Sequence, residues 1–146
     1  MASTLKLEIV TPEAKVYSEE VDSVRLPGAE GELGIYPNHA PLMAQVKAGE
    51  LIAHKGGEES ILAVGHGFVE ITGDHVAILT DNAADSADID EAAAEEAKAK
   101  AQQRLEEGSD ISEDEAKALA QAILYSEAQL KAQAPPRLSR DFLPDA

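Results

Sequence analysis

The stretch from Val24 to Leu42 constrains the fold of this chain more than any other part of the sequence. It reads VRLPGAEGELGIYPNHAPL, so glycine and proline interrupt strand-forming residues at short intervals. Glycine accepts the positive φ of tight turns, and proline lacks the amide proton that a central strand position needs. We therefore expect one strand to end near Leu26 and another to begin near Glu32, with the segment after Ile35 at a sheet edge or across the end of the fold.

Four residues of this stretch are expected to have structural roles. Gly28, which follows Pro27, and Gly31 are expected to be turn residues, because proline fixes φ and glycine accepts the positive φ of a tight turn. Gly34 lies inside a strand-like run, which suggests a bulge or a close backbone approach. Pro37 has no amide proton for a sheet ladder, so it should mark the point where pairing stops.

The first 82 residues carry strand signals and no helical period. Leu5, Leu7 and Ile9 alternate with more exposed positions, as in a half-buried strand. Similar runs recur every 8 to 12 residues up to Asp81, and the glycines at 56–57 and 73 suit hairpin turns. This spacing favours an all-β sandwich or flattened barrel over residues 1–82.

Residues 83–134 are alanine-rich and predict two helices. Asp88 with Glu91 reads as a capping box, so the first helix is expected over 89–107, and Gly108 can end it in a left-handed conformation. Ser112 with Glu115 caps a second helix expected over 113–133. The short link makes an antiparallel hairpin the natural arrangement.

Both helices have one small apolar face, and the chain after them loses its helical pattern. The faces are expected to be formed by Ile89, Ala93, Ala97, Ala101 and Leu105 in the first helix, and by Ala116, Leu119, Ala120, Ile123 and Leu130 in the second. Alanine seams bury few methylene groups, so the hairpin should dock weakly. Residues 135–146 combine three prolines with charged residues and are expected to be a disordered tail.

Composition excludes several classes of function. The chain has 146 residues and a net charge of −16, which argues against binding to nucleic acid or anionic lipid. Aromatic residues make up 3%, too few for a platform that stacks bases or sugars. There is no cysteine, and no apolar run approaches the ~20 residues of a membrane span. Proteins are therefore the expected partners, and direct membrane insertion is not expected.

No constellation of residues points to catalysis or to a metal. His39, His54, His66 and His75 do not pair at ligand spacing, although four histidines on a β scaffold invite a metal hypothesis. Glu30 and Glu32 flank one glycine and could serve as acid and base, but nothing apolar beside them would raise a pKa, so two exposed loop carboxylates are the better interpretation. We conclude that the chain has no active site of its own.

The run from Leu26 to Leu42 resembles the signature of the epsilon subunit family of F-type ATP synthases. The run AVGHGFVE at 63–70 also resembles the second glycine-rich strand crossing of that family. The resemblance extends from about Leu5 to Gln133. It implies a ten-stranded N-terminal β-sandwich followed by a C-terminal antiparallel two-helix hairpin, in a non-catalytic subunit of the central stalk.

The resemblance also implies partners and a location. Family members contact the gamma subunit and the ring of c subunits, and Glu30, Glu32 and His39 match loop positions facing the ring, unless His39 only satisfies its own loop. The family couples proton transport to ATP synthesis as a peripheral part of a membrane complex. Because no transit peptide is recognisable, the cytoplasmic face of a bacterial inner membrane is the expected place, and a plastid-encoded copy would look similar. The alternative is a free-standing β-sandwich that binds a small molecule or sugar, and co-purification with a membrane ATPase complex would distinguish the two.

A nucleotide motif of the family is degenerate in this chain. Ile89 and Asp90 match the first two residues of the pattern Ile/Leu-Asp-x-x-Arg-Ala, but Ala93 replaces its arginine. The loss removes a charge-assisted phosphate contact, so no cofactor and no ATP binding at physiological concentration are expected. The hairpin of the family can extend toward the catalytic alpha and beta subunits. The second helix here offers only Lys117 and Lys131 among several acids, so mild inhibition of ATP hydrolysis at most is expected.

Overall fold

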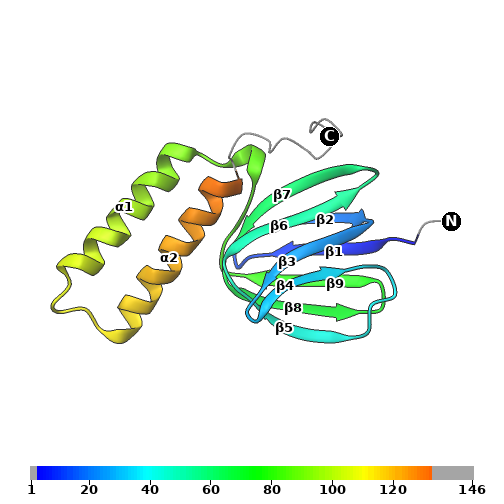
Figure 1. Cartoon of the computed structure of the whole chain (residues 1–146), viewed down its shortest axis with the longest axis horizontal. Helices are drawn as coiled ribbons and strands as arrows, with labels where there is room; N and C mark the ends of the chain where they lie inside the picture. Colours follow the sequence, from blue (N-terminus) through cyan, green and yellow to red (C-terminus); the bar gives the residue numbers. More distant parts are fainter. Residues whose placement is uncertain (1–2, 133–146) are drawn as a thin grey trace, which may run out of the picture.

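The computed structural model describes residues 3–132, so the tail expected at 135–146 lies outside the described residues. A β-sandwich forms one part, and two antiparallel helices stand against one end of it (Figure 1). The expected order of a ten-stranded sandwich followed by a helical hairpin is confirmed.

Ten strands make up the sandwich. They are β1 (Leu5–Val10), β2 (Lys15–Val21), β3 (Ser23–Gly28), β4 (Gly31–Ile35), β5 (Leu42–Val46), β6 (Gly49–Lys55), β7 (Glu58–Val64), β8 (Gly67–Thr72), β9 (His75–Thr80) and β10 (Ala83–Asp85). The turns at Gly56, Gly57 and Gly73 have positive φ, which confirms the hairpins expected at these glycines.

The strands form two layers joined at one corner. One layer has the order β10-β7-β6-β3-β4 and the other β5-β8-β9-β1-β2, and the residue pair Gly28 and Val46 connects them. All strand pairs are antiparallel except β1 with β9, which run parallel. β1 therefore lies inside its layer, between β2 and β9, and β9 is distant from it in sequence (Figure 1).

The core lies between the two layers and is aliphatic. Strand alternation sends Leu5, Leu7 and Ile9 fully inside, as their sequence period predicts. Seventeen buried hydrophobic residues form this cluster, with contributions from nine of the ten strands. Such a core holds the surface loops on a rigid scaffold.

The stretch that dominates the sequence forms the β3–β4 hairpin and the loop after it. Gly31 has φ 134°, and a Cβ on Gly28 would come within 2.5 Å of the Gly31 carbonyl oxygen, so both positions require glycine. The interpretation of Gly34 as a bulge or close approach is wrong. Gly34 pairs regularly with Arg25, and a Cβ there would make ordinary contact with Tyr36, because β4 is an edge strand with open space beside it.

The sheet continues past the boundary expected at Asn82. β10 pairs with β7, and a 3-10 helix, η1 (Ser86–Asp88), follows it. Local sequence did not predict this strand, because alanines carry little strand propensity. Its backbone pairing with β7 stabilises it instead.

The helices α1 (Glu91–Glu107) and α2 (Glu113–Ala132) fall close to their expected ranges, but two predicted end signals are wrong. Asp90, not Asp88, caps α1, and its carboxylate accepts a hydrogen bond from the Ala93 amide at 3.1 Å. Gly108 has φ −84° and is not left-handed. Glycine is needed there because a Cβ would overlap the Ile111 side chain. The predicted cap of α2 is confirmed, since Ser112 accepts from the Glu115 amide.

Within residues 3–132, α2 makes the main helix contacts with the sandwich, against β6 and β7, and α1 packs mainly on α2. Ala128 and Ala132 of α2 meet Ala63 of β7 in a small second core that includes Ile89. The predicted helix faces were partly wrong. Ala93, Ala97 and Ala120 are exposed, because alanines are so frequent that the apolar period does not fix the rotation of the helix.

Candidate functional site

An exposed apolar patch covers the outer face of β5, β8 and β9. Its members, which we call the outer patch, are Met43, Phe68, Leu79 and the half-buried Val10 of β1. Phe68 lies opposite Leu79, and Leu79 opposite Val10, so three of them form a row across neighbouring strands. Met43, Phe68 and Leu79 are 65%, 52% and 55% exposed. Contiguous exposed apolar surface of this kind marks a protein-binding face.

A hollow of about 460 Å³ continues the outer patch toward the helices. Val10, Pro12 and Leu79 give it an apolar lining, and His66 and Asp81 add polar groups to it. A Cβ on Gly67 would overlap the Leu79 carbonyl oxygen, so the strand crossing beside the hollow tolerates only glycine. The backbone around the hollow is therefore tightly fixed.

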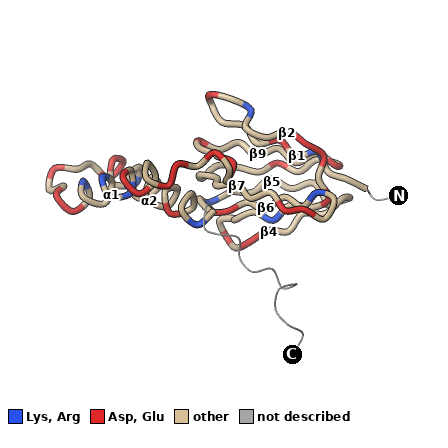
Figure 2. Tube along the Cα trace, turned by 90° about the horizontal axis from the view of Figure 1, so that it is seen from above, with Lys and Arg blue, Asp and Glu red and all other residues tan. Residues whose placement is uncertain are grey.

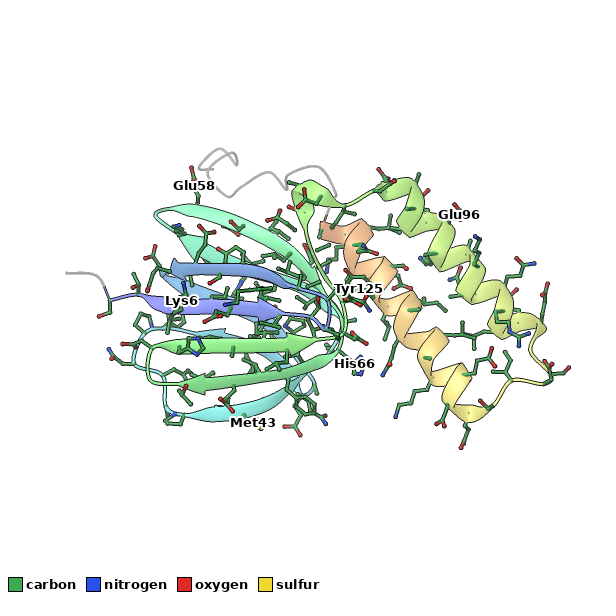
Figure 3. The ribbon with its side chains drawn as sticks, turned by 180° about the vertical axis from the view of Figure 1, so that it is seen from behind. Lys6, Met43, Glu58, His66, Glu96 and Tyr125 are labelled. Carbon is green, nitrogen blue, oxygen red and sulfur yellow. The ribbon has the colours of Figure 1, made fainter. Side chains whose placement is uncertain are left out.

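Polar side chains of the sandwich gather at its junction with the hairpin. His66 Nδ1 lies 3.0 Å from Asp81 Oδ2, and the Thr80 hydroxyl donates to the carbonyl of His66 or of Asn82. Burial, with the nearby charge of Asp81, raises the pKa of Tyr125 on α2 to about 12. His66 lies at the end of the sandwich that faces the helices, and Tyr125 of α2 lies across the junction from it (Figure 3).

A second hollow, which we call the side groove, opens between β4 and β5 with a volume of about 610 Å³. Leu33, Leu42, Met43 and Ala44 supply its apolar lining, and Glu30 and Glu32 lie on its polar side. Glu32 makes a loose ion pair with Arg25, with 3.7 Å between Oε1 and Nε. Glu30 makes no ion pair within residues 3–132.

The structure separates the three residues that the sequence proposed for one interface. Glu30 lies in the turn before β4, whereas His39 lies in the loop after it, and the five residues of β4 span roughly 17 Å between them. That loop is held by the Asn38 amide, which donates to Asp74 Oδ1 at 3.0 Å. His39 Nδ1 donates to the Ala40 carbonyl at 2.6 Å, so its ring is engaged by its own loop. Pro37 lies beyond the end of β4, where pairing stops.

The two residues of the degenerate nucleotide motif have structural roles. Ile89 is buried in the small core between α2 and β7, and Asp90 caps α1. Ala93, which takes the place of the motif's arginine, is exposed. Within residues 3–132 no three histidine, aspartate or glutamate side chains gather as metal ligands, and no helix is long and apolar enough to cross a membrane.

Sequence reasoning missed the outer patch, although the signal was present. In β8 the alternation that buries Val69 and Ile71 places Phe68 on the opposite face, and in β9 the same alternation places Leu79 outside. A phenylalanine and a leucine on the solvent face of adjacent strands are the sign of a docking surface. Grouping the exposed residues of these strands into one patch also requires the register of the strands, which local sequence patterns do not provide.

The fold and its surfaces define a class of protein: a β-sandwich with a small docked helical hairpin and an exposed apolar face. A model of the family described as "ATP synthase, Delta/Epsilon chain, beta-sandwich domain" matches residues 4–86. The chain belongs to this family of ATP synthase delta and epsilon chains.

Curated relatives agree with this assignment. The chain is 47% identical to the ATP synthase epsilon chain of Desulforamulus reducens over 76% of this chain and 85% of that protein. It is 42% identical to the epsilon chain of Laribacter hongkongensis over 89% of this chain and 93% of the relative. Both alignments extend beyond the sandwich into the helical region, because they cover more of the chain than residues 4–86.

Solved structures show the same fold. One is a chain from the Euglena gracilis mitochondrial ATP synthase, OSCP/F1/c-ring, with a TM-score of 0.71, 20% identity and coverage of 88% of this chain and 81% of that one. Another is a chain from the central stalk and c-ring of the Tetrahymena thermophila mitochondrial ATP synthase, with a TM-score of 0.57, 12% identity and coverage of 90% and 98%.

Proposed function

We propose that this chain is the epsilon subunit in the central stalk of an F-type ATP synthase, where it links the gamma subunit to the c-ring and takes part in coupling proton transport to ATP synthesis. It is a non-catalytic subunit of the complex. The observation that carries the proposal is the outer patch on a sandwich of the epsilon family. The alternative of a free-standing binder of small molecules or sugars has no comparable support.

The outer patch is the proposed contact with the gamma subunit. Met43, Phe68 and Leu79 offer apolar area on a face that is backed by the buried core. Large apolar side chains at the centre of an interface supply most of its binding energy. The hollow beside Leu79 provides a site for one protruding side chain of the partner.

The turn that carries Glu30 and Glu32 is the proposed contact with the c-ring. Both carboxylates are exposed, and Glu30 has no ion-pair partner within the described residues. Exposed carboxylates favour polar, basic loops and contribute mainly to orientation and association rate. His39 does not belong to this contact, because it lies beyond the opposite end of β4.

The hairpin is the proposed regulatory part, with weak action on the catalytic alpha and beta subunits. Acidic residues are spread over both helices (Figure 2). Lys131 of α2 lies 3.6 Å from Glu50 of β6, so of the two lysines on α2 only Lys117 has no ion pair within residues 3–132. We place the subunit peripherally at the cytoplasmic face of a bacterial inner membrane, as part of the complex.

The test compares matched charge insertions in the complete chain. Phe68→Glu and Leu79→Glu should each weaken binding to the purified gamma subunit by at least tenfold, which corresponds to about 1.4 kcal/mol. Leu124→Glu, at a comparably exposed leucine of α2, is the control and should bind normally. Normal gamma binding by both patch variants would contradict the proposed contact. Reconstitution tests the function itself: a complex without this chain that assembles and makes ATP equally well would exclude a role in coupling.

A further inference from the structure

The side groove has the walls of a site for an extended segment. β4 pairs only with β3, and β5 pairs with β8 on one side and meets β3 only at Val46. The two strand edges that border the groove are therefore largely unpaired within residues 3–132. Unpaired edges readily add a further strand, which gives backbone hydrogen bonds while side-chain pockets give specificity.

The lining of the side groove selects the chemistry of its occupant. Leu33, Leu42 and Ala44 are apolar, and Met43, 65% exposed, contributes to both the groove and the outer patch. Glu30 and Glu32 make the polar side acidic. A fitting segment therefore brings a large apolar side chain together with an arginine or lysine close to it in sequence.

Such a segment follows α2 in this chain. Residues 133–146 read QAPPRLSRDFLPDA and contain Phe142, one of only two phenylalanines in the sequence. Arg140 precedes it by two positions, so in an extended segment both side chains would point the same way. Arg137 and Arg140 balance the two aspartates of this stretch, and the excess charge of −16 therefore belongs to residues 1–132. Residues 133–146 are thus less acidic than the rest of the chain.

The described contacts place the end of α2, where this segment begins, at the same end of the sandwich as the β3–β4 turn that borders the side groove. Lys131 lies 3.6 Å from Glu50, which directly follows Gly49. A Cβ on Gly49 would lie 3.0 Å from the Pro27 ring, and Pro27 pairs with Glu32 on the groove. The ten residues from Ala132 to Phe142 can span at most ~35 Å. That length is enough to follow the path of these contacts from α2 to the side groove.

We propose that residues 137–143 bind the side groove of their own chain, with Phe142 against Leu42 and Met43 and with Arg140 facing Glu30. A short tether gives an effective concentration in the millimolar range, so even a weak contact is occupied. The bound segment covers the Glu30–Glu32 turn, and a partner that uses this turn must displace it. The inference is independent of assembly with other subunits, because it concerns the isolated chain.

The sequence makes a direct optical test available, because it contains no tryptophan. In the complete chain carrying Phe142→Trp, the single tryptophan should emit at shorter wavelength than in the same chain unfolded in urea. Adding Met43→Glu should abolish this blue shift. Adding Leu79→Glu, a matched change at a 55% exposed residue outside the groove, should leave it intact.

Backbone NMR of the complete chain provides a second measurement. Phe142→Ser with Arg140→Glu should shift the amide signals of Gly31, Glu32 and Met43 and leave those of β1 and β9 unchanged. An unshifted tryptophan emission with unchanged groove signals would overturn the proposal. So would a blue shift removed by Leu79→Glu and not by Met43→Glu, since the segment would then bind the outer patch.

Discussion

Two glycines of β4 differ in what their positions demand, although they lie three residues apart. Gly31 has φ 134°, where a side chain is strained, and Gly34 has ordinary space around a Cβ. We expect Gly31→Val to destabilise the fold by about 1–3 kcal/mol. Gly34→Val, the matched control on the same strand, should stay within about 0.5 kcal/mol. Urea unfolding of the complete chain measures both, and equal stabilities would show that the β3–β4 turn adapts to a side chain.

Glu8 gives a pH-dependent contribution at the residue scale. Its carboxylate accepts hydrogen bonds from Lys15 and His75, both at 2.8 Å, and these lower its pKa to about 2. A depressed folded-state pKa stabilises the protein above the pKa of the unfolded chain, near 4.5, and the stabilisation is lost as the pH falls toward 2. Glu8→Gln should therefore flatten the fall in stability between about pH 5 and pH 2. Urea midpoints across this range test it, and identical slopes for the two proteins would contradict the ion-pair role.

At the scale of elements, the last strand decides where the sandwich can be cut. The sequence predicted the boundary at Asn82, but β10 follows this residue and pairs with the edge of β7 that β6 leaves free. We expect a chain of residues 1–86 to keep the β circular dichroism signal and to melt about 5 °C above a chain of residues 1–82, a difference near 1 kcal/mol for a domain of this size. Loss of the β signal from the longer fragment would mean that the sandwich depends on α2.

Local patterns predicted most elements, and pairing explains the exceptions. The alternation of Leu5, Leu7 and Ile9 and the hairpin glycines correctly predicted strands, because each needs only neighbouring residues. β10 was missed because Ala83 and Ala84 depend on β7 for their conformation. The cap of α1 was misplaced because two aspartates lie two positions apart, and only the path through η1 selects Asp90.

The candidate surfaces were predictable only in part. Glu30 and Glu32 were identified as exposed turn carboxylates, but their distance from His39 depends on the direction of β4. The outer patch combines residues from β5, β8 and β9, and its recognition requires their register. A sequence pattern can give the face of each strand, whereas the neighbours on that face follow from the fold.

At the scale of the whole molecule, the hairpin should not respond to nucleotide. Ile89 packs in the small second core, Asp90 caps α1, and position 93 is an alanine where the motif has an arginine. Calorimetry of the isolated chain should show no saturable ATP binding up to about 1 mM ATP. A dissociation constant of about 1 mM corresponds to a binding free energy of ~4 kcal/mol, so any ATP binding should be weaker than that. The variant Ala93→Arg, at an exposed position, is the comparison that restores the missing charge. Saturable binding by the unaltered chain would show that other groups replace the arginine.

The same reasoning predicts weak control of the assembled enzyme. The acidic surface of α2, with Lys131 engaged by Glu50, gives little attraction to an acidic segment of a catalytic subunit. Deleting residues 87–146, which spares β10, should change the ATP hydrolysis rate of a reconstituted complex by no more than about twofold, or ~0.4 kcal/mol. The complex with the complete chain is the control. A large rise on deletion would mean that the hairpin makes inhibitory contacts through its alanine faces or through Arg137 and Arg140.

The parallel pair of β1 and β9 has a consequence for biosynthesis. Lys6 pairs with His75, so β1, which is synthesised before the other nine strands, has no inner neighbour until nearly the whole sandwich has been made. At ~5–20 residues per second, the N-terminal hairpin waits several seconds with one edge open. Pairing between strands so distant in sequence also slows folding, because the entropy of closing the loop is lost before the stabilising contacts form. A nascent chain stalled before residue 75 should therefore be a target for chaperones, while one stalled well after residue 85 should already resist proteases.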